Sequence, residues 1–238
     1  ITRSQIIQEV RNFFIENEYL EMETPVLQPI YGGAEAHPFI THHNSLDRDL
    51  YLRIAPELYL RRLLIGGFER VFEIGRNFRN EGISNRHNPE FTFIEAYASY
   101  VDYNFSMDLI EQLFNRLATR FGTNQVYGEH TIDMSNIRRV RFRDIVREVC
   151  EVSAGATDDE LIRLFEDNVE STLINPTIVY DYPACISPLS LCHSDDSTTS
   201  QRFEMYVAGM EIANAYSELN DVALHIENLG DADRDFIE

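Results

Sequence analysis

The sequence predicts an α+β fold organised around one antiparallel hairpin. Residues 71–81 and 91–103 alternate between two faces, as β-strands do. The segment between them holds four turn residues: Gly82, Asn85, Asn88 and Pro89. Before and after the hairpin, apolar residues recur at helical spacing, which predicts amphipathic helices. With 238 residues, the chain has ample length for a hydrophobic core.

The composition is that of an ordinary globular protein, with 44% hydrophobic and 25% charged residues. No apolar run reaches about 18 residues, so no membrane span is expected. No signal peptide is expected either, because Arg3, Glu9 and Arg11 interrupt the first apolar residues.

The chain has three cysteines, at positions 150, 185 and 192. An odd number in a chain of this size suggests free thiols in a reducing compartment, so a cytoplasmic location is expected. Cys185, Cys192 and His193 are an alternative as partial metal ligands, although their spacing fits no zinc pattern well.

All 20 basic residues are arginine, and the sequence contains no lysine. Lysine is normally among the commonest residues, so either the protein was made without it or modified lysines are missing from the printed sequence. A measured mass of 27.6 kDa would support the first explanation. Taken at face value, the formal charge of −20 argues against a broad nucleic-acid surface.

In the first hundred residues, a capping pattern and alternating side chains predict one helix and two strands before the hairpin. A capping box, T-x-x-Q from Thr2, opens a predicted helix over residues 3–17. Residues 19–27 alternate like a strand, and Pro25 restricts pairing there, which suggests an edge or an interface. Residues 49–55 are predicted as a further strand.

Two short features in this part could serve a ligand. Gly33 follows Gly32, and such a pair allows close approach of a ligand or simply makes a turn. Pro56 starts a predicted helix that ends at Gly66-Gly67. Glu57 in its first turn either complements the helix dipole or binds a cation.

The hairpin itself is predicted to carry a binding site. Alternation places a guanidinium, two carboxylates and two rings on one sheet face: Arg79, Glu81, Phe91, Glu95 and Tyr97. A sheet face that only contacts water does not require this combination of charged and aromatic side chains, so we interpret it as a binding site.

After the hairpin, helices are predicted from an N-cap at Ser106, over residues 142–149, and after a second capping box that begins at Thr157. Residues 123–140 are expected to be irregular, and residues 177–182 form a predicted strand. These elements are expected to pack and carry no chemistry.

Residues 202–220 are interpreted as two strands that meet near Gly209. A two-residue turn at Val207-Ala208 would place Glu204 directly opposite Glu211. Facing carboxylates favour a divalent cation with nucleotide phosphates between them, and two solvated glutamates are the alternative. Asn214, Tyr216 and Glu218 are predicted to share one strand face.

Together these segments resemble a known family. FRNEG (78–82), RHNPEFT (86–92), APELYL (55–60), the ETP of residues 23–25 and MEIANAYSELND (210–221) are similar to the catalytic domain of class II lysyl-tRNA synthetases. The similarity runs from residue 3 to 103 and from 176 to 221. It implies an antiparallel sheet flanked by helices, and a homodimer whose interface contains the ETP segment.

The resemblance implies a reaction and a set of ligands. Lysine would attack the α-phosphate of ATP, with Mg²⁺, and the lysyl group would then pass to tRNA(Lys). Arg79 would be catalytic. The lysine ligands would be Gly33, Glu57, Arg79, Glu95, Tyr97, Asn214 and Glu218. The ATP ligands would be Arg79, Glu81, His87, Asn88 and Phe91. Glu204 and Glu211 would hold magnesium.

Three departures from the family pattern are noted, the first of which is a segment from Cys150 to Thr157 that is shorter than expected. Residues 1–238 are expected to be one catalytic domain in which the third signature motif and the N-terminal OB-fold domain are not recognised. Two alternatives therefore stay open. One is an OB-less paralogue that attaches a lysine-type amino acid to elongation factor P, and the other is an inert lysine- or nucleotide-binding module.

Overall fold

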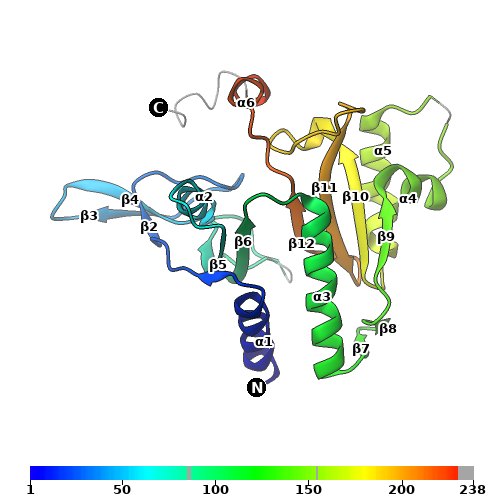
Figure 1. The fold of residues 1–238 in the computed structure, drawn as a ribbon, viewed down its shortest axis with the longest axis horizontal. Coiled ribbons are helices and arrows are strands. Elements are labelled where there is room, and N and C mark those ends of the chain that lie inside the picture. Colours follow the sequence, from blue (N-terminus) through cyan, green and yellow to red (C-terminus); the bar gives the residue numbers. More distant parts are fainter. Residues whose placement is uncertain (85–86, 154, 230–238) are drawn as a thin grey trace. The chain divides into compact units, whose positions relative to one another are not determined.

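A computed structural model describes residues 1–84, 87–153 and 155–229, so Asn85 and Arg86 of the predicted loop lie outside the described residues (Figure 1). The chain divides into two units, Ile1–Tyr100 and Val101–Glu238. Both combine helices with largely antiparallel sheets, which confirms the predicted α+β class.

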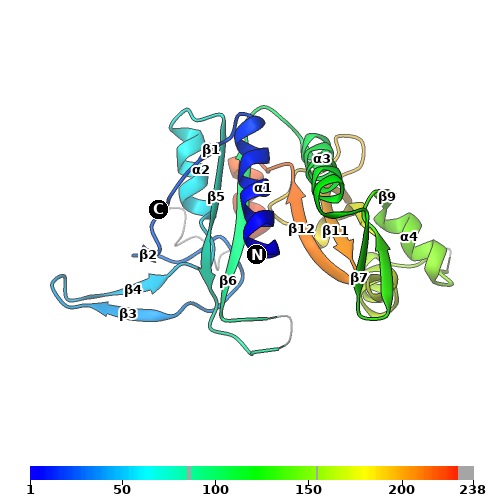
Figure 2. The same ribbon diagram turned by 90° about the horizontal axis from the view of Figure 1, so that it is seen from below.

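The first unit contains the predicted hairpin. Strands β5 (Arg70–Phe78) and β6 (Glu90–Ala98) pair antiparallel, and the two-residue strand β1 (Leu20–Glu21) joins β5 in parallel at the sheet edge (Figure 2). The continuous strand predicted over residues 19–27 is wrong, because β1 ends at Glu21, but the segment before Pro25 does lie at a sheet edge as predicted. Strand β5 ends at Phe78, so Glu81 lies in the following loop and not on the strand as predicted.

Helix α1 (Thr2–Glu16) packs against this sheet through aromatic rings. The ring of Phe14 stacks on Phe72 with centroids 5.2 Å apart, and both side chains are buried. The helix is confirmed, but its predicted capping box is wrong. Ile1 is the N-cap, and no side chain caps the helix.

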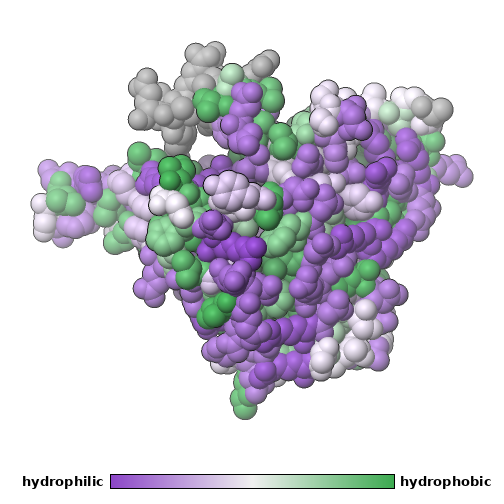
Figure 3. Space-filling view, viewed as in Figure 1, coloured by the Kyte–Doolittle hydropathy of each residue, from purple (hydrophilic) through white to green (hydrophobic). Residues whose placement is uncertain are grey.

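A second sheet of the first unit has the order β2-β4-β3 and is antiparallel throughout. Its strands are β2 (Leu27–Gln28), β3 (Ile40–His43) and β4 (Arg48–Leu52). The β3–β4 hairpin, at the left of Figure 3, exposes apolar side chains among polar ones, including Ile40 and Leu46. Helix α2 (Glu57–Ile65) follows Pro56 and ends at Gly66, as predicted to within one residue.

Three α-helices of the second unit were expected. They are α3 (Tyr103–Phe121), α4 (Phe142–Val149) and α5 (Asp158–Leu164). The predicted cap at Ser106 is wrong, because the Asp102 carboxylate accepts the N–H groups of Asn104 and Phe105 at 3.0 and 3.2 Å. Thr157 does cap α5, since its hydroxyl accepts the Glu160 N–H at 3.3 Å.

Further helical segments follow these helices. A π-helix (Phe165–Val169) and a 3₁₀ turn (Glu170–Thr172) continue from α5, a second 3₁₀ turn covers Ala184–Ile186, and α6 spans Val222–Leu229.

The main sheet of the second unit has the order β12-β11-β10-β9. Its strands are β9 (Arg138–Arg141), β10 (Thr177–Pro183), β11 (Thr199–Val207) and β12 (Met210–Tyr216). Only β9 and β10 are parallel. The hairpin β7 (Asn124–Tyr127) and β8 (His130–Asp133) lies in the stretch predicted to be irregular, so that prediction is wrong.

The predicted pairing of Glu204 with Glu211 is also wrong. The turn lies one residue later, at Ala208-Gly209, where both residues have positive φ. A bulge between Met205 and Tyr206 shifts the register. As a result, Glu204 faces Asn214, and Glu211 faces Tyr206.

Candidate functional site

The clearest candidate binding feature of the first unit is a carboxylate on β6. The Tyr97 hydroxyl donates to Glu95 Oε1 at 2.7 Å, so the two side chains share a face as predicted. The pKa of Glu95 is raised to about 7, mainly by desolvation and to a smaller extent by the charges of Glu57 and Glu73, against the lowering effects of the Tyr97 hydrogen bond and Arg61. A carboxyl that is poorly solvated among other carboxylates gains stability when a cation binds beside it.

Helix α2 places Glu57 in the electrostatic range of Glu95. The Glu57 carboxylate forms an i,i+4 ion pair with Arg61 at 3.0 Å. Gly33 packs against the base of this side chain, because a Cβ at Gly33 would lie 2.7 Å from Glu57 Cβ. Gly33 also has a φ of +83°, which favours glycine. The structure thus brings Gly33 and Glu57 together.

Arg79 and Phe91 lie at the end of the hairpin that leads into its loop. The Arg79 N–H donates to the Pro89 carbonyl at 2.9 Å, and the guanidinium carbon lies 5.3 Å from the centre of the Phe91 ring. Arg79 Nε is buried and has no partner among the described residues. An unpaired guanidinium nitrogen is a donor available to an anionic ligand.

The other three predicted ATP ligands are not gathered into a pocket. Glu81, His87 and Asn88 are exposed on the loop between the strands. His87 Nδ1 lies 2.8 Å from the Ser84 hydroxyl.

Sequence reasoning missed a buried charge network beside the hairpin. Arg53 Nη1 lies 2.5 Å from Glu73 Oε1, and these two residues are only 2% and 4% exposed. Glu73 Oε2 accepts both the N–H and the hydroxyl of Thr24, at 3.1 and 2.6 Å. The available signals were an arginine within the apolar run LYLRIA and the glycine of FEIG.

In the second unit, Glu204 is buried and held on both oxygens. Arg202 donates to Oε1, while the hydroxyls of Tyr182 and Tyr206 donate to Oε2, the former at 2.9 Å. Arg202 also donates to the Ile186 carbonyl at 2.9 Å. Sequence reasoning did not identify Arg202, although the carboxylate it contacts, Glu204, is only two residues away on the same strand.

Glu211 is not paired with Glu204 across the two strands, but the charge of Glu204 still affects it. Partial desolvation, then the charge of Glu204, raises the pKa of Glu211 to about 7. Among the described residues, no group of three or more His, Cys, Asp or Glu side chains is arranged to hold a metal ion. Mg²⁺ on a nucleotide needs only one or two carboxylates plus phosphate oxygens, and a carboxylate keeps spare lone pairs. Glu204 and Glu211 therefore fit that donor chemistry.

Asn214 and Tyr216 line a hollow of about 180 Å³. Its other walls are Ile186, Ser187, Pro188, Leu189, Ser190 and Arg202. Glu218 lies just beyond β12, where it forms a β-bridge with Ser190. Strand β12 ends at Tyr216, so the strand face predicted for these three residues is confirmed for Asn214 and Tyr216 only.

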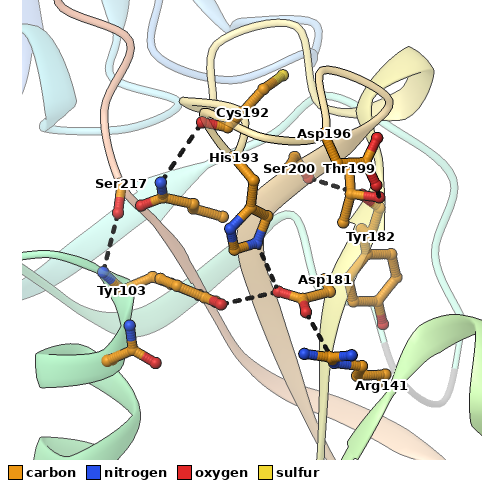
Figure 4. A network of polar contacts seen from close by, with 12 residues as sticks. Tyr103, Arg141, Asp181, Tyr182, Cys192, His193, Asp196, Thr199, Ser200 and Ser217 are labelled. Atoms are coloured by element: carbon orange, nitrogen blue, oxygen red, sulfur yellow. Dashed lines mark hydrogen bonds and ion pairs between the residues drawn. The ribbon is translucent and has the colours of Figure 1, made fainter.

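A second network missed by sequence reasoning centres on Asp181 (Figure 4). Its Oδ1 accepts the Tyr103 hydroxyl at 2.7 Å and lies 3.0 Å from His193 Nε2, and Oδ2 pairs with Arg141 Nε at 3.2 Å. Asp181 has a φ of +61° at a bulge of β10. The Tyr103 N–H donates to the Ser217 hydroxyl at 2.9 Å, so the network reaches the residue before Glu218.

All three cysteines are free, as expected. His193, which sequence reasoning grouped with Cys185 and Cys192, contacts Asp181 instead.

Comparison with known proteins gives a consistent result. The family model described as tRNA synthetases class II (D, K and N) matches residues 1–235. The chain is 50% identical to the lysine–tRNA ligase of Dichelobacter nodosus, covering 92% of this chain and 49% of that protein. It is 47% identical to the lysine–tRNA ligase of Methanoculleus marisnigri, with 92% and 48% covered. The chain thus spans about half the length of the curated relatives it matches.

Proposed function

Because the chain belongs to the class II tRNA synthetase family, we propose that it carries the lysine-activating part of a lysine–tRNA ligase. In this reaction, a lysine carboxylate oxygen bonds to the α-phosphorus of ATP, and pyrophosphate leaves. The lysyl group of the adenylate then passes to tRNA(Lys). The observation that carries the proposal is the poorly solvated carboxyl of Glu95, which burial and two neighbouring carboxylates make receptive to an ammonium group.

The first unit would bind both ammonium groups of lysine. Glu95 would pair with the ε-ammonium, and Tyr97 orients its carboxylate through the 2.7 Å hydrogen bond. Glu57 and the backbone at Gly33 suit the α-ammonium, since close packing holds them together. A neutral side chain in place of the ε-ammonium would leave Glu95 unpaired, which provides discrimination against apolar amino acids.

Arg79 would act at the reacting phosphate. Its buried, unpaired Nε and its place beside Phe91 support a role in clamping the lysine carboxylate and offsetting the charge that develops on the α-phosphate. Phe91 would stack on adenine, and Glu81, His87 and Asn88 would close around the nucleotide from the exposed loop.

Further predicted ligands belong to the second unit. Asn214 and Glu218 stay predicted ligands of lysine. Glu204 and Glu211 would hold Mg²⁺, which when bound neutralises charge on the ATP phosphates. The hydrogen bonds from Arg202, Tyr182 and Tyr206 would fix the orientation of the Glu204 carboxylate.

A homodimer is part of the proposal. The segment around the ETP motif exposes several large apolar side chains of the first unit: Leu20, Val26, Leu27 and Ile30. Clustered exposed apolar residues of this kind support a protein interface, and the partner would be a second copy.

We also propose a cytoplasmic location, since the three free cysteines favour a reducing compartment. In the part of the chain that the structure describes, no helix combines the length and apolar character needed to cross a bilayer.

Isothermal titration calorimetry with lysine and norleucine tests the proposal directly. The two ligands have side chains of similar length, but norleucine lacks the ε-ammonium. Binding of lysine with norleucine at least about 100-fold weaker is expected, because the site would lose a buried charge pair. Equal affinities, or binding of neither ligand to the folded chain, would contradict it.

A further inference from the structure

The hairpin register places two carboxylates directly opposite each other. Glu73 on β5 faces Glu95 on β6, and facing residues in an antiparallel pair have Cβ atoms about 4.5–5.5 Å apart. Like charges at such positions destabilise a sheet unless one of them is compensated. The two glutamates differ sharply in their surroundings.

Glu73 is compensated on both of its oxygens. Arg53 Nη1 pairs with Oε1 at 2.5 Å, and the Thr24 N–H and hydroxyl donate to Oε2 at 3.1 and 2.6 Å. The carboxylate therefore has a cation and two dipoles of its own and is satisfied without a ligand.

Arg53 is held in place by parts of the chain far apart in sequence. Its Nε donates to the Arg76 carbonyl at 2.9 Å, and its Nη1 donates to the Thr24 hydroxyl at 3.1 Å. Gly75 makes the space, because a Cβ there would lie 2.2 Å from Arg53 Nη2. The guanidinium carbon lies 5.4 Å from the centre of the Phe93 ring. A buried cation with this many fixed neighbours has a defined position beside the hairpin.

We propose that the Arg53–Glu73 pair offsets the charge of Glu73 beside the pocket for the ε-ammonium, so that Glu73 adds no net negative charge there and Glu95 is left to pair with the cationic side chain. Arg53 and Glu73 are positioning residues and touch no ligand. This inference rests on the proposed binding of the lysine ε-ammonium and deepens it, since it names what tunes the pocket for one positive charge.

Ionisable groups from three elements affect the pKa of Glu95. Tyr97 lies on its own strand, Glu73 on β5, and Glu57 and Arg61 on α2. Desolvation raises the pKa of Glu95 most, and Glu73 has the smallest effect of these groups. Arg53 lies against Glu73, so its positive charge opposes the negative charge that Glu73 presents to Glu95. Unbalancing the pair in either direction should therefore shift the titration of Glu95.

The test is a carbon-13 NMR titration of the Glu95 carboxyl in the full chain, assigned by its loss in Glu95→Gln. Arg53→Gln leaves the Glu73 charge uncompensated, so the pKa of Glu95 should rise by about one unit or more. Glu73→Gln leaves the guanidinium uncompensated, so it should fall by a similar amount. The double variant Arg53→Gln/Glu73→Gln should restore the original value.

The control is another ion pair of the same unit. Arg11 and Glu21 lie 2.9 Å apart with both side chains about one-third exposed. Arg11→Gln and Glu21→Gln should leave the Glu95 titration unchanged. If Arg53→Gln fails to fold, the fall in Glu73→Gln and its reversal in the double variant still decide the question.

Shifts of the same sign in the two single variants, or no shift in Glu73→Gln, would overturn the inference, because loss of packing alone has no reason to act in opposite directions. Lysine calorimetry on the same samples separates this result from the proposed function. Opposite shifts without any lysine binding would support the role of the pair in setting the pocket charge and would refute lysine as the ligand.

Discussion

Substitution of Glu95 by glutamine removes one poorly solvated charge while it keeps the side-chain shape. The amide oxygen can still accept the Tyr97 hydroxyl, which lies 2.7 Å from Glu95 Oε1. The variant therefore isolates the charge of Glu95 from its packing. The affinity for lysine and the stability of the chain should change in opposite directions.

The loss of affinity follows from the pairing of charges. An ammonium buried without its carboxylate partner costs about 3–5 kcal/mol, so lysine should bind Glu95→Gln about 2 × 10²- to 5 × 10³-fold more weakly at pH 8. In the unsubstituted chain, the carboxyl has a pKa of about 7 and must lose its proton to pair with the ligand. Its lysine affinity should therefore fall about tenfold per pH unit below pH 7, whereas that of Glu95→Gln should stay flat.

The stability change has the opposite sign. The pKa of Glu95 is raised in the folded chain, from 4.5 to about 7, so the folded state holds this proton more tightly than the unfolded state. The resulting stabilisation is complete below pH 4.5 and is lost as the pH rises through 7. Glu95→Gln should match the unsubstituted chain near pH 4.5 and exceed it at pH 8 by up to about 3 kcal/mol.

Calorimetry checks both expectations on the same preparations. Titrations with lysine between pH 5 and pH 8 give the affinities, and scanning calorimetry at pH 4.5 and 8 gives the melting temperatures. A gain of 3 kcal/mol corresponds to about 6–12 °C for a chain of this size. A Glu95→Gln variant that binds lysine within about threefold of the unsubstituted chain at pH 8, or that melts lower at pH 8, would refute the reasoning.

Three further substitutions test other parts of the site. Arg79→Ala should lower the rate of ATP–pyrophosphate exchange by about 10³-fold, because it removes a donor to charge formed in the transition state; a rate within tenfold of the original would remove Arg79 from the mechanism. Gly33→Ala places a Cβ 2.7 Å from Glu57 Cβ at a φ of +83°, so the melting temperature and the lysine affinity should both fall, and an unchanged affinity would separate Gly33 from the site. Asp181→Asn leaves Arg141 and His193 without their shared carboxylate and should destabilise the chain by about 1–3 kcal/mol in denaturant titrations; a loss below about 0.5 kcal/mol would show that the network contributes little.

The central hairpin could be predicted because its strands are long and alternate regularly. Nine residues of each strand pair in unbroken register, so Glu95 and Tyr97 fall on one face as the pattern requires. Glu81 was misplaced because the strand stops at Phe78, and alternation in the sequence does not mark where pairing ends.

The pairing of β11 with β12 could not be predicted from alternation. A bulge at Met205/Tyr206 and a turn at Ala208-Gly209 each change the register, and neither leaves a hydrophobic signal. Glu204 therefore faces Asn214, although the two glutamates still interact electrostatically.

Strand β9 was missed for a different reason. Three of its four residues are arginines, so it has little apolar alternation. Their partners come from elsewhere in the chain: Arg139 pairs with Glu111 at 2.5 Å, and Arg141 pairs with Asp181 at 3.2 Å. The same holds for Arg53 and Glu73, which lie 20 residues apart. Charge pairs between distant segments leave no periodic pattern in a sequence.

ATP–pyrophosphate exchange, run with magnesium and each of the twenty amino acids in turn, tests the central claim most directly. It reports the reversible formation of the aminoacyl-adenylate and needs no tRNA. The account predicts exchange with lysine and with no other amino acid. Folded chain that exchanges with a neutral or acidic amino acid, or with none, would contradict the assignment of the Glu95 pocket to lysine activation.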